Sequence, residues 1–314
     1  MKTHAFLISA HSFPEQLEDI VNLLYASNHY FFIHIDKKSK KMLSSDAILR
    51  LKEKENINFV QPMRVNHGGF SQISCILKLL EEAYKCKCSK IDYVHLISGQ
   101  DYPCMANSDF DALFEQVEKS YMYFDSMEDT LECRKWNYPY RTDYFNFVDL
   151  HVPFLPYKRF RKILIKCLNK LVKIFKRKPI TDAYAGWTWF SWHRSVVEYV
   201  LTFLKNNPSY IKRFRRTFCM DEIFFHTMLY EKANDLNIVK NNALRFIEWN
   251  PRKGEKLDHK NASRKHLLHP LVLDEREYDD IINSGAIFCR KVHPVQSAKL
   301  ITLLKKRNCH STIN

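Results

Sequence analysis

Strand-like and helix-like segments alternate along the first hundred residues, and this alternation constrains the fold more than any other feature of the sequence. Four short apolar runs have the composition of β-strands, and amphipathic stretches with helical spacing lie among them. In chain order these segments are residues 5–9, 15–26, 30–35, 57–61, 71–85 and 93–97. Strands that alternate with helices predict an α/β fold with a mostly parallel central sheet flanked by helices.

The second half of the chain is less regular. It opens with an aromatic and charged region and contains a tryptophan-rich strand, by default a core strand, one further strand and three helices. These segments are residues 121–157, 185–192, 195–205, 221–233, 244–249 and 295–306. With 314 residues and 46% hydrophobic content, the chain can bury a large core. We therefore predict one continuous domain made of two halves, residues 1–120 and 121–314.

Two polar segments follow strands of the first half. His34 and Asp36 end the strand at 30–35 together with two lysines, and Asp101 lies in a tight turn after the strand at 93–97. Ligands of parallel sheets bind beyond the carboxyl ends of the strands, so both segments are candidate ligand sites. The same residues need no function if Asp36 caps a turn and if Gly99, Asp101 and Pro103 form a tight turn. Both interpretations stay open.

The composition excludes several classes of site. Only six glycines occur, and none forms a G-x-G-x-x-G or P-loop motif. The net charge of +14 favours a partner that is polyanionic or carries phosphate. Nucleic acid is not expected, because no RNP, zinc-finger or helix-turn-helix signature accompanies the charge. Nine scattered cysteines predict reduced thiols, and Cys86-Lys87-Cys88 lacks the second ligand pair of a structural zinc site.

Residues 158–178 predict a basic amphipathic helix. This stretch carries ten Lys or Arg and no acidic residue, and its apolar residues recur at i, i+3 and i+4. One interpretation is a helix that lies on an anionic membrane surface. The other is an ordinary helix packed on the core with a solvated basic face. The sequence does not separate the two.

Acidic residues occur in two further places. Asp221 and Glu222 precede an aromatic helical run, where Asp221 is predicted to be the N-cap and Glu222 is either a first-turn acid or a base. Asp109-Phe110-Asp111 spells the D-x-D by which many nucleotide-sugar transferases bind a metal. Ser108 and Asp111 also fit an S-x-x-D capping box at the start of a helix over 110–118. We prefer the capping box and predict no catalytic metal.

The amino-terminal apolar run is too short for a signal peptide, and no later stretch is long enough to span a membrane. We therefore expect a cytoplasmic protein, with the helix at 158–178 able to hold it at the inner face of the cell membrane.

Seven segments carry a resemblance through their joint order. They are HIDKKS at 34–39, HGGFS at 67–71, LISGQDYP at 96–103, GWTWF at 186–190, DEIFF at 221–225, LRFIEW at 244–249 and IFCRK at 287–291. Together they resemble the core-2/I-branching β-1,6-N-acetylglucosaminyltransferase family, which is similar at motif level to the peptide O-xylosyltransferases.

The resemblance implies a GT-A type fold, a UDP-sugar donor, inversion at the anomeric carbon, and no cofactor or divalent metal. Glu222 then looks like the catalytic base. The implied donor-binding residues are His34, Asp36, Asp101, Arg290 and Lys291, and the implied acceptor-binding residues are Glu128, Arg141 and Trp189. An inverting transferase needs a base for the acceptor hydroxyl and positive charge on the departing diphosphate, which Arg290 and Lys291 can supply.

The chain also departs from the pattern of that family. Cys289 and Val292 flank the Arg-Lys pair where a small residue and phenylalanine are usual, and His67 stands where tryptophan is common. A further basic residue before the last motif has no secure counterpart, Arg264 and Lys265 being the candidates. The membrane anchor and disulfide-rich layout of the animal enzymes are absent, so a soluble microbial member is expected.

The leading prediction is a transferase that moves N-acetylglucosamine from UDP-GlcNAc to a hydroxyl of a glycan or lipid-linked glycan, in cell-surface polysaccharide or lipid-linked oligosaccharide synthesis. UDP-xylose or another UDP-hexose is the alternative donor. A non-enzymatic basic protein that binds anionic membrane or nucleic acid is the other alternative.

Overall fold

The structure is a computed structural model that describes residues 1–87, 90–116, 118–136, 141–151, 158–171, 178, 180–252 and 269–310. The chain divides into two compact units. Unit 1 comprises Met1–Val60, Cys86–Glu118 and Leu244–Asn314, and unit 2 comprises Gln61–Lys85 and Lys119–Ala243. This division differs from the predicted halves, 1–120 and 121–314, because the chain leaves unit 1 after residue 60 and returns to it twice.

Unit 1 contains the predicted parallel sheet. Its strands are β1 (His4–Ala10), β2 (His29–Ile35), β3 (Ile57–Phe59) and β4 (Tyr93–Ser98), in the order β3-β2-β1-β4. All three pairings are parallel, and His4 is in register with both His29 and Tyr93. Successive side chains of a strand point to opposite faces. Phe6 and Leu7 are both fully buried, so β1 is covered on both faces and the predicted α/β class is confirmed.

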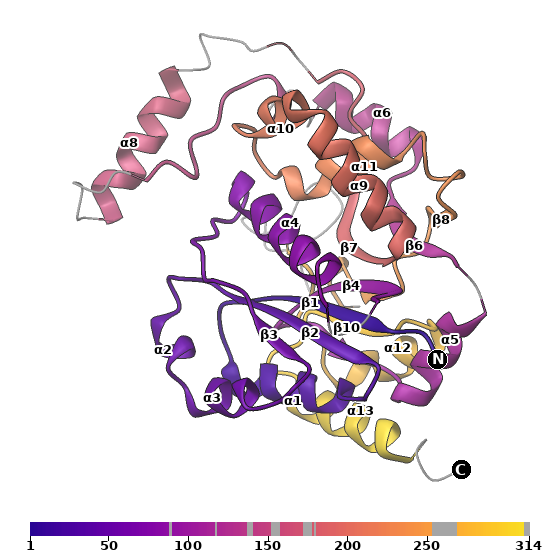
Figure 1. Ribbon diagram of the computed structural model, residues 1–314. Coiled ribbons are helices and arrows are strands. Elements are labelled where there is room, and N and C mark those ends of the chain that lie inside the picture. Colours follow the sequence, from indigo (N-terminus) through magenta and orange to yellow (C-terminus); the bar gives the residue numbers. More distant parts are fainter. Residues whose placement is uncertain are drawn as a thin grey trace. The chain divides into compact units, whose positions relative to one another are not determined.

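The helices of unit 1 begin with α1, the helix expected at 15–26. The described helices are α1 (Pro14–Leu24), α2 (Lys40–Leu43), α3 (Asp46–Lys52), α5 (Asn107–Glu115), η3 (Glu275–Glu277), α12 (Tyr278–Asn283) and α13 (Ala298–His310). The apolar stripe of α1, including Leu17 and Ile20, is buried, and α1 lies beside α3 (Figure 1). The last predicted helix, at 295–306, is α13.

The predicted capping box of Ser108 and Asp111 is wrong. Helix α5 begins at Asn107 after Ala106, which makes no side-chain cap. Asp111 therefore lies one turn inside the helix, where its Oδ1 atom accepts a hydrogen bond from Asn28 and lies 2.8 Å from His29 Nε2.

A second, three-stranded sheet completes unit 1. It consists of β5 (Tyr102–Pro103), β10 (Phe288–Arg290) and β9 (Arg245–Ile247), in that order. Strand β10 runs antiparallel to β5 and parallel to β9. This pairing brings Arg290 and Lys291, at the end of β10, next to the turn that follows β4.

Unit 2 contains a sheet in the order β7-β6-β8. Its strands are β6 (Ser120–Phe124), β7 (Gly186–His193) and β8 (Ile238–Val239), and β6 pairs antiparallel with β7 and parallel with β8. Strand β7 is the predicted tryptophan-rich strand. Its Phe190 and Trp192 rings are fully buried and stack at 3.5 Å, and both contact Phe225. The interpretation of this strand as a core element is confirmed for these two rings.

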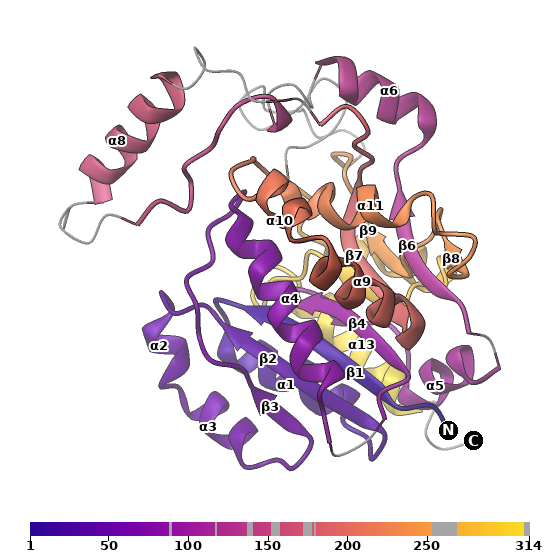
Figure 2. The ribbon, with the colours of Figure 1, turned by 45° about the horizontal axis from the view of Figure 1, so that its top comes forward.

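The described helices of unit 2 are α4 (Phe70–Tyr84), α6 (Met127–Trp136), α8 (Lys158–Leu171), α9 (Arg194–Asn206), α10 (Pro208–Phe214), η2 (Met220–Glu222) and α11 (Phe224–Leu229). Helices α4 and α9 are neighbours, as Figure 2 shows. The helix expected at 221–233 is divided into η2 and the short α11.

Helix α8 corresponds to the predicted basic helix over 158–178, whose residues 172–177 lie outside the described residues. Its apolar face is not packed into a core: Phe160, Ile163 and Leu171 are 58%, 56% and 58% exposed. This observation disfavours the interpretation of α8 as an ordinary core-packed helix.

Within the part of the chain that the structure describes, none of the helices has the length and apolar character required to cross a membrane. Among the described residues, Cys86, Cys104, Cys167, Cys219 and Cys289 lie outside any disulfide.

Candidate functional site

The carboxyl ends of β1, β2 and β4 and the end of β10 carry the candidate donor residues of unit 1. The backbone N–H of Asp36 donates to the carbonyl oxygen of Ala10, and the Ser39 hydroxyl donates to that of His11. These bonds join the loop after β2 to the loop after β1. The topology therefore gathers segments that the sequence separates, as the rule for parallel sheets predicts.

Asp36 shapes the loop after β2. It is only 7% exposed, and its Oδ1 accepts a 2.8 Å hydrogen bond from the backbone N–H of Lys38. The ammonium group of Lys38 lies 3.3 Å from Oδ2. The turn-capping interpretation of Asp36 thus describes its contacts. His34 is fully buried in β2, and its predicted contact with a donor nucleotide stays a prediction.

Asp101 and Arg290 form the best-defined contact of this edge. The Asp101 carboxyl group is fully buried, and its Oδ2 accepts hydrogen bonds from the Ser98 N–H (2.7 Å), the Ser98 hydroxyl (2.5 Å) and the Arg290 guanidinium (2.7 Å). The side chain of Arg290 is 12% exposed. Asp101 is therefore placed to orient Arg290, which has the more accessible side chain of the two.

A second arginine, Arg245, lies beside this pair. Its guanidinium donates to the carbonyl oxygen of Leu96 and lies 4.8 Å from the Phe288 ring centroid. The pKa of Arg245 is lowered to about 9. Burial has the largest effect and lowers it, Asp101 raises it, and Arg290 lowers it. Two guanidinium groups thus share the field of one carboxylate, which leaves this edge with excess positive charge. The sequence reasoning gave Arg245 no site role, although it lies in a motif of the resemblance.

Lys291 and His11 extend the same edge. Burial lowers the pKa of Lys291, and the neighbouring Arg290 lowers it further. Burial also lowers the pKa of His11, while Asp36 raises it and Lys291 and Lys38 lower it. His11 therefore lies within electrostatic range of Asp36, Lys291 and Lys38. His11 was missed, although it follows strand β1 as Asp36 follows β2.

In unit 2, Glu222 forms an ion pair with Arg141. The distance between Arg141 Nη1 and Glu222 Oε2 is 2.6 Å, and the two side chains are 18% and 39% exposed. Burial lowers the pKa of Arg141, but Glu222, followed by Cys219 and Asp221, raises it by more in total, so the pKa is raised overall. The structure therefore brings together one predicted base and one predicted acceptor residue.

The prediction that Asp221 caps a helix is wrong. Helix α11 begins at Phe224, and its N-cap residue is Ile223, which makes no side-chain cap. The Oδ2 atom of Asp221 instead accepts hydrogen bonds from Gln72 (3.0 Å) and Thr188 (3.2 Å). A left-handed Cys219, with φ of 50°, starts the turn η2, and the non-helical Ile223 separates the two acids of this turn from α11.

Gly68 explains how α4 supports this turn. Its φ of +73° favours glycine, and a Cβ atom there would approach the Phe218 ring to 2.4 Å. The carbonyl of Gly68 accepts the backbone N–H of Cys219, and the N–H of Gly68 donates to the Gln72 side chain. The turn at 67–69 thus holds Cys219, which precedes Glu222 in the chain. It also holds the side-chain amide of Gln72, which donates to Asp221.

Asp125 is a further member of this cluster. Its pKa is raised to about 6 by burial, then by Glu222 and Asp129, whereas Arg141 opposes them. The pKa of Asp221 is likewise raised to about 6, first by burial and then by Glu222. Neither acid was predicted as a site residue, although Asp125 directly follows strand β6. The cluster combines three carboxyl groups with one guanidinium.

The remaining predicted acceptor residues lie outside these contacts. Glu128 is exposed in the first turn of α6. Trp189 is half-buried on β7 and, by strand alternation, faces away from Thr188, which binds Asp221. The side chains of Arg134 and Lys135 and the stretch with Arg264 and Lys265 lie outside the described residues. Their roles stay predictions.

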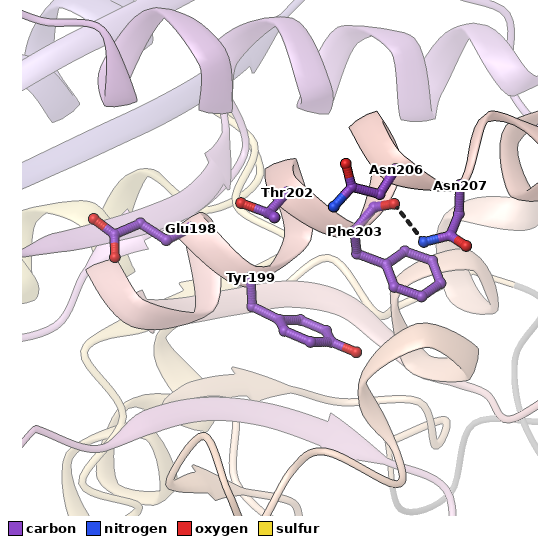
Figure 3. Close-up of a pocket in the computed structure, with 6 residues that line it drawn as sticks. All are labelled: Glu198, Tyr199, Thr202, Phe203, Asn206 and Asn207. Atoms are coloured by element: carbon purple, nitrogen blue, oxygen red, sulfur yellow. Dashed lines mark hydrogen bonds between the residues drawn. The ribbon is translucent and has the colours of Figure 1, made fainter.

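A surface depression of about 400 Å³ lies along α9 and contains none of the predicted site residues. It is lined by Glu198, Tyr199, Thr202, Phe203, Asn206 and Asn207 (Figure 3). It is therefore separate from the candidate site residues of unit 2.

The chain is similar to animal xylosyltransferases. It is 24% identical over 267 residues to "Xylosyltransferase 1" of Rattus norvegicus, which covers 82% of this chain and 29% of the rat protein. It is 24% identical over 254 residues to "Xylosyltransferase 2" of Canis lupus familiaris, covering 78% of this chain and 26% of the dog protein. The chain thus spans less than a third of the length of these relatives.

Among solved structures, the chain is similar to the galactosyltransferase LgtC, crystallised with donor and acceptor sugar analogues. The TM-score is 0.44 at 10% identity, covering 98% of this chain and 96% of that chain. A likeness at this score says nothing of the chain's function.

The family model described as Branch: Core-2/I-Branching enzyme matches residues 4–275 and so includes both units. The matched stretch contains Asp101 and Glu222, and it ends before Arg290. The chain therefore belongs to the Core-2/I-Branching enzyme family.

Proposed function

We propose that the protein transfers a sugar from a UDP-sugar to a hydroxyl group of a glycan acceptor, with inversion at the anomeric carbon. The observation that carries this proposal is the positive edge of unit 1, where Arg290 is held by the buried Asp101 beside Arg245 and Lys291. Positive charge at the carboxyl ends of parallel strands suits the diphosphate of a nucleotide-sugar. Membership of the family supports the same reaction class.

In the proposed reaction, Glu222 takes the proton of the acceptor hydroxyl. The freed oxygen forms a bond to the anomeric carbon from the face opposite the diphosphate, and the bond from that carbon to the diphosphate oxygen breaks. The electron pair leaves with UDP, whose growing charge Arg290 and Lys291 stabilise. Arg141 keeps Glu222 oriented through the 2.6 Å ion pair.

Independence from a divalent metal is part of this proposal. A guanidinium presents a fork of donors and an ammonium presents a compact charge, so Arg290 and Lys291 can together neutralise two phosphate groups. The buried Asp101 supports this role, because a hydrogen-bonded carboxylate restricts the Arg290 side chain to one direction.

The donor sugar is proposed to be N-acetylglucosamine, with UDP-xylose as the alternative. The relatives reported above carry the name xylosyltransferase. The resemblance of the seven motifs described above implies N-acetylglucosamine. A panel of UDP-sugars, read by release of UDP with and without glycan acceptors, tests both. UDP-GlcNAc is expected to give the fastest transfer. Faster transfer from UDP-xylose would reverse the donor assignment, and no turnover with any UDP-sugar or acceptor would contradict the proposal.

An anionic membrane surface is proposed as an additional partner, bound through α8. The exposed side chains of Phe160, Ile163 and Leu171 accompany the exposed Lys166 and Lys170 on a helix without acidic residues. Apolar side chains can enter the boundary of the acyl chains while lysines meet anionic headgroups. This contact would place the protein where lipid-linked or surface glycans are assembled.

A further inference from the structure

A buried polar cluster of unit 1 lies at the amino ends of the strands, away from the edge that carries Asp36 and Asp101. His4 begins β1, His29 begins β2, and these two residues are in register. Asp111 reaches them from α5. Both histidine side chains are 0% exposed, and the Asp111 side chain is 19% exposed. The cluster takes no part in the proposed sugar transfer.

The three side chains converge on one point. The Nε2 atom of His29 lies 2.8 Å from Asp111 Oδ1, and the Nε2 atom of His4 lies 3.5 Å from the same oxygen. One ligand atom from each residue can be chosen so that all three lie within 4.8 Å of one another. Ligand atoms of a tetrahedral zinc site, with bonds of about 2.0–2.2 Å, lie roughly 3.3 Å apart. Only small movements would bring the three atoms to that spacing.

The outer nitrogen of each histidine is already held. His29 Nδ1 lies 2.5 Å from the carbonyl oxygen of Leu24, which can only accept, so Nδ1 carries the proton. His4 Nδ1 lies 3.1 Å from His95 Nε2 and can donate to it. Metal-binding histidines are held in this way, with the second ring nitrogen donating to an acceptor that fixes the tautomer. Asn28, which donates to Asp111, orients the carboxylate likewise.

These tautomers leave two inner nitrogens facing an anionic oxygen. His29 Nε2 lies 2.8 Å from Asp111 Oδ1, so either a proton or a metal ion lies between these two atoms. His4 Nε2 is fully buried and has no hydrogen-bond partner within the described residues. With its Nδ1 proton directed at His95, His4 offers the lone pair of Nε2, and a cation held there would satisfy a buried acceptor that is costly to leave unpaired. The unpartnered nitrogen of His4 therefore points to a ligand independently of the convergence of the three side chains.

We propose that His4, His29 and Asp111 bind a divalent transition metal, with zinc as the ion whose preferred imidazole and carboxylate ligands match. Bound there, the ion would tie β1, β2 and α5 together. Its role would be structural, because the cluster lies at the end of the strands opposite the donor residues. The proposal is therefore independent of the proposed function.

The wild-type protein itself gives the first test. Protein made without a histidine tag and stripped with a chelator is titrated with zinc in competition with a chromophoric chelator. One equivalent is expected to bind, and cobalt in its place is expected to show the visible absorption of tetrahedral coordination. Failure of the folded wild-type protein to bind zinc at micromolar concentration overturns the proposal.

Variants of α5 give the second test. Asp111→Asn removes a ligand, whereas Asp109→Asn makes the same change at an exposed position of the same helix. Asp111→Asn is expected to weaken zinc binding more than the ~10–100-fold typical of an outer-shell loss, with Asp109→Asn unchanged. Zinc is expected to raise the Tm of the wild type and of Asp109→Asn only. Equal zinc affinity and equal Tm shifts in a folded Asp111→Asn protein would refute the site.

Discussion

Arg290 donates a 2.7 Å hydrogen bond to the carboxylate of Asp101, a fully buried group 189 residues earlier in the chain. Ser98 donates to the same oxygen from its backbone and its side chain, so Asp101 is held at the end of β4 before Arg290 is added. The proposed binding of the donor diphosphate by Arg290 depends on this contact.

Replacing Arg290 should reduce both stability and UDP affinity. Arg290→Gln leaves the buried Asp101 with less counter-charge, and breaking a buried ion pair costs about 3–5 kcal/mol. Calorimetric UDP titration and denaturant unfolding measure the two effects. The double variant Asp101→Asn with Arg290→Gln is expected to recover part of the stability but none of the UDP affinity. Recovery of UDP affinity in the double variant would remove Arg290 from the donor site.

Replacing Glu222 should affect turnover rather than donor binding. Glu222→Gln retains the shape of the side chain but cannot take a proton, so we expect kcat to fall by about 10²–10⁴-fold with UDP affinity little changed. Steady-state kinetics and UDP titration check the two parts. The matched control is Glu198→Gln, an exposed glutamate on α9. A Glu222→Gln protein with full turnover would exclude Glu222 as the base.

Asp125 should make stability depend on pH. Burial, with Glu222 next, raises its pKa to about 6 from an ordinary value of 3.8. The folded state therefore binds more protons than the unfolded state between about pH 4 and 6, and this contribution to stability is lost as pH rises through about 6. The free energy of unfolding of Asp125→Asn, relative to wild type, should improve by on the order of 2 kcal/mol from pH 4.5 to 7.5. A difference independent of pH contradicts the assignment.

Helix α8 should bind anionic vesicles. Ile163→Ser with Leu171→Ser removes exposed apolar surface, and Lys166→Gln with Lys170→Gln removes about 1 kcal/mol of attraction per lysine. Co-sedimentation with phosphatidylglycerol vesicles is expected to fall for both pairs, and only the lysine pair should reduce the salt dependence. Leu49→Ser, an exposed leucine on α3, is the control. Unchanged sedimentation of both pairs would leave α8 without a membrane role.

Chelation separates the proposed catalysis from the proposed zinc site. Transfer measured within minutes of EDTA addition should persist, since Arg290 and Lys291 carry the charge of the leaving group. Loss of transfer that manganese restores would reject metal independence. Loss that follows the fall in Tm, and that zinc alone reverses, would instead concern His4, His29 and Asp111.

The rule that ligands bind beyond the carboxyl ends of parallel strands located part of the proposed donor site from the sequence alone. Asp36 and Asp101 were found because each follows an apolar run, and the structure puts both at the carboxyl ends of the parallel sheet. The same rule also applied to His11 and Asp125, but neither lies in a conspicuous motif. Arg245 was missed as a site residue because its importance comes from burial beside Asp101, which a linear pattern does not reveal.

The errors arose where local rules met long-range contacts. Asp111 satisfied the spacing of a capping box, yet in the structure this residue of α5 contacts His29 at the start of strand β2. Asp221 preceded a helical run, yet the left-handed Cys219 starts a separate turn and α4 supplies Gln72 as a partner. The division into units was also beyond the sequence pattern, because each unit contains separate segments of the chain.

The small sheet β5-β10-β9 sets an order of events during synthesis. Tyr102–Pro103 is synthesised well before Phe288–Arg290, the strand with which it pairs. The contact between Asp101 and Arg290 cannot form until that later segment has been made, so the proposed donor site is incomplete in a shorter nascent chain. Nucleotide bound at the proposed site would therefore stabilise the chain only after β10 has been made, and would not guide the earlier stages of folding.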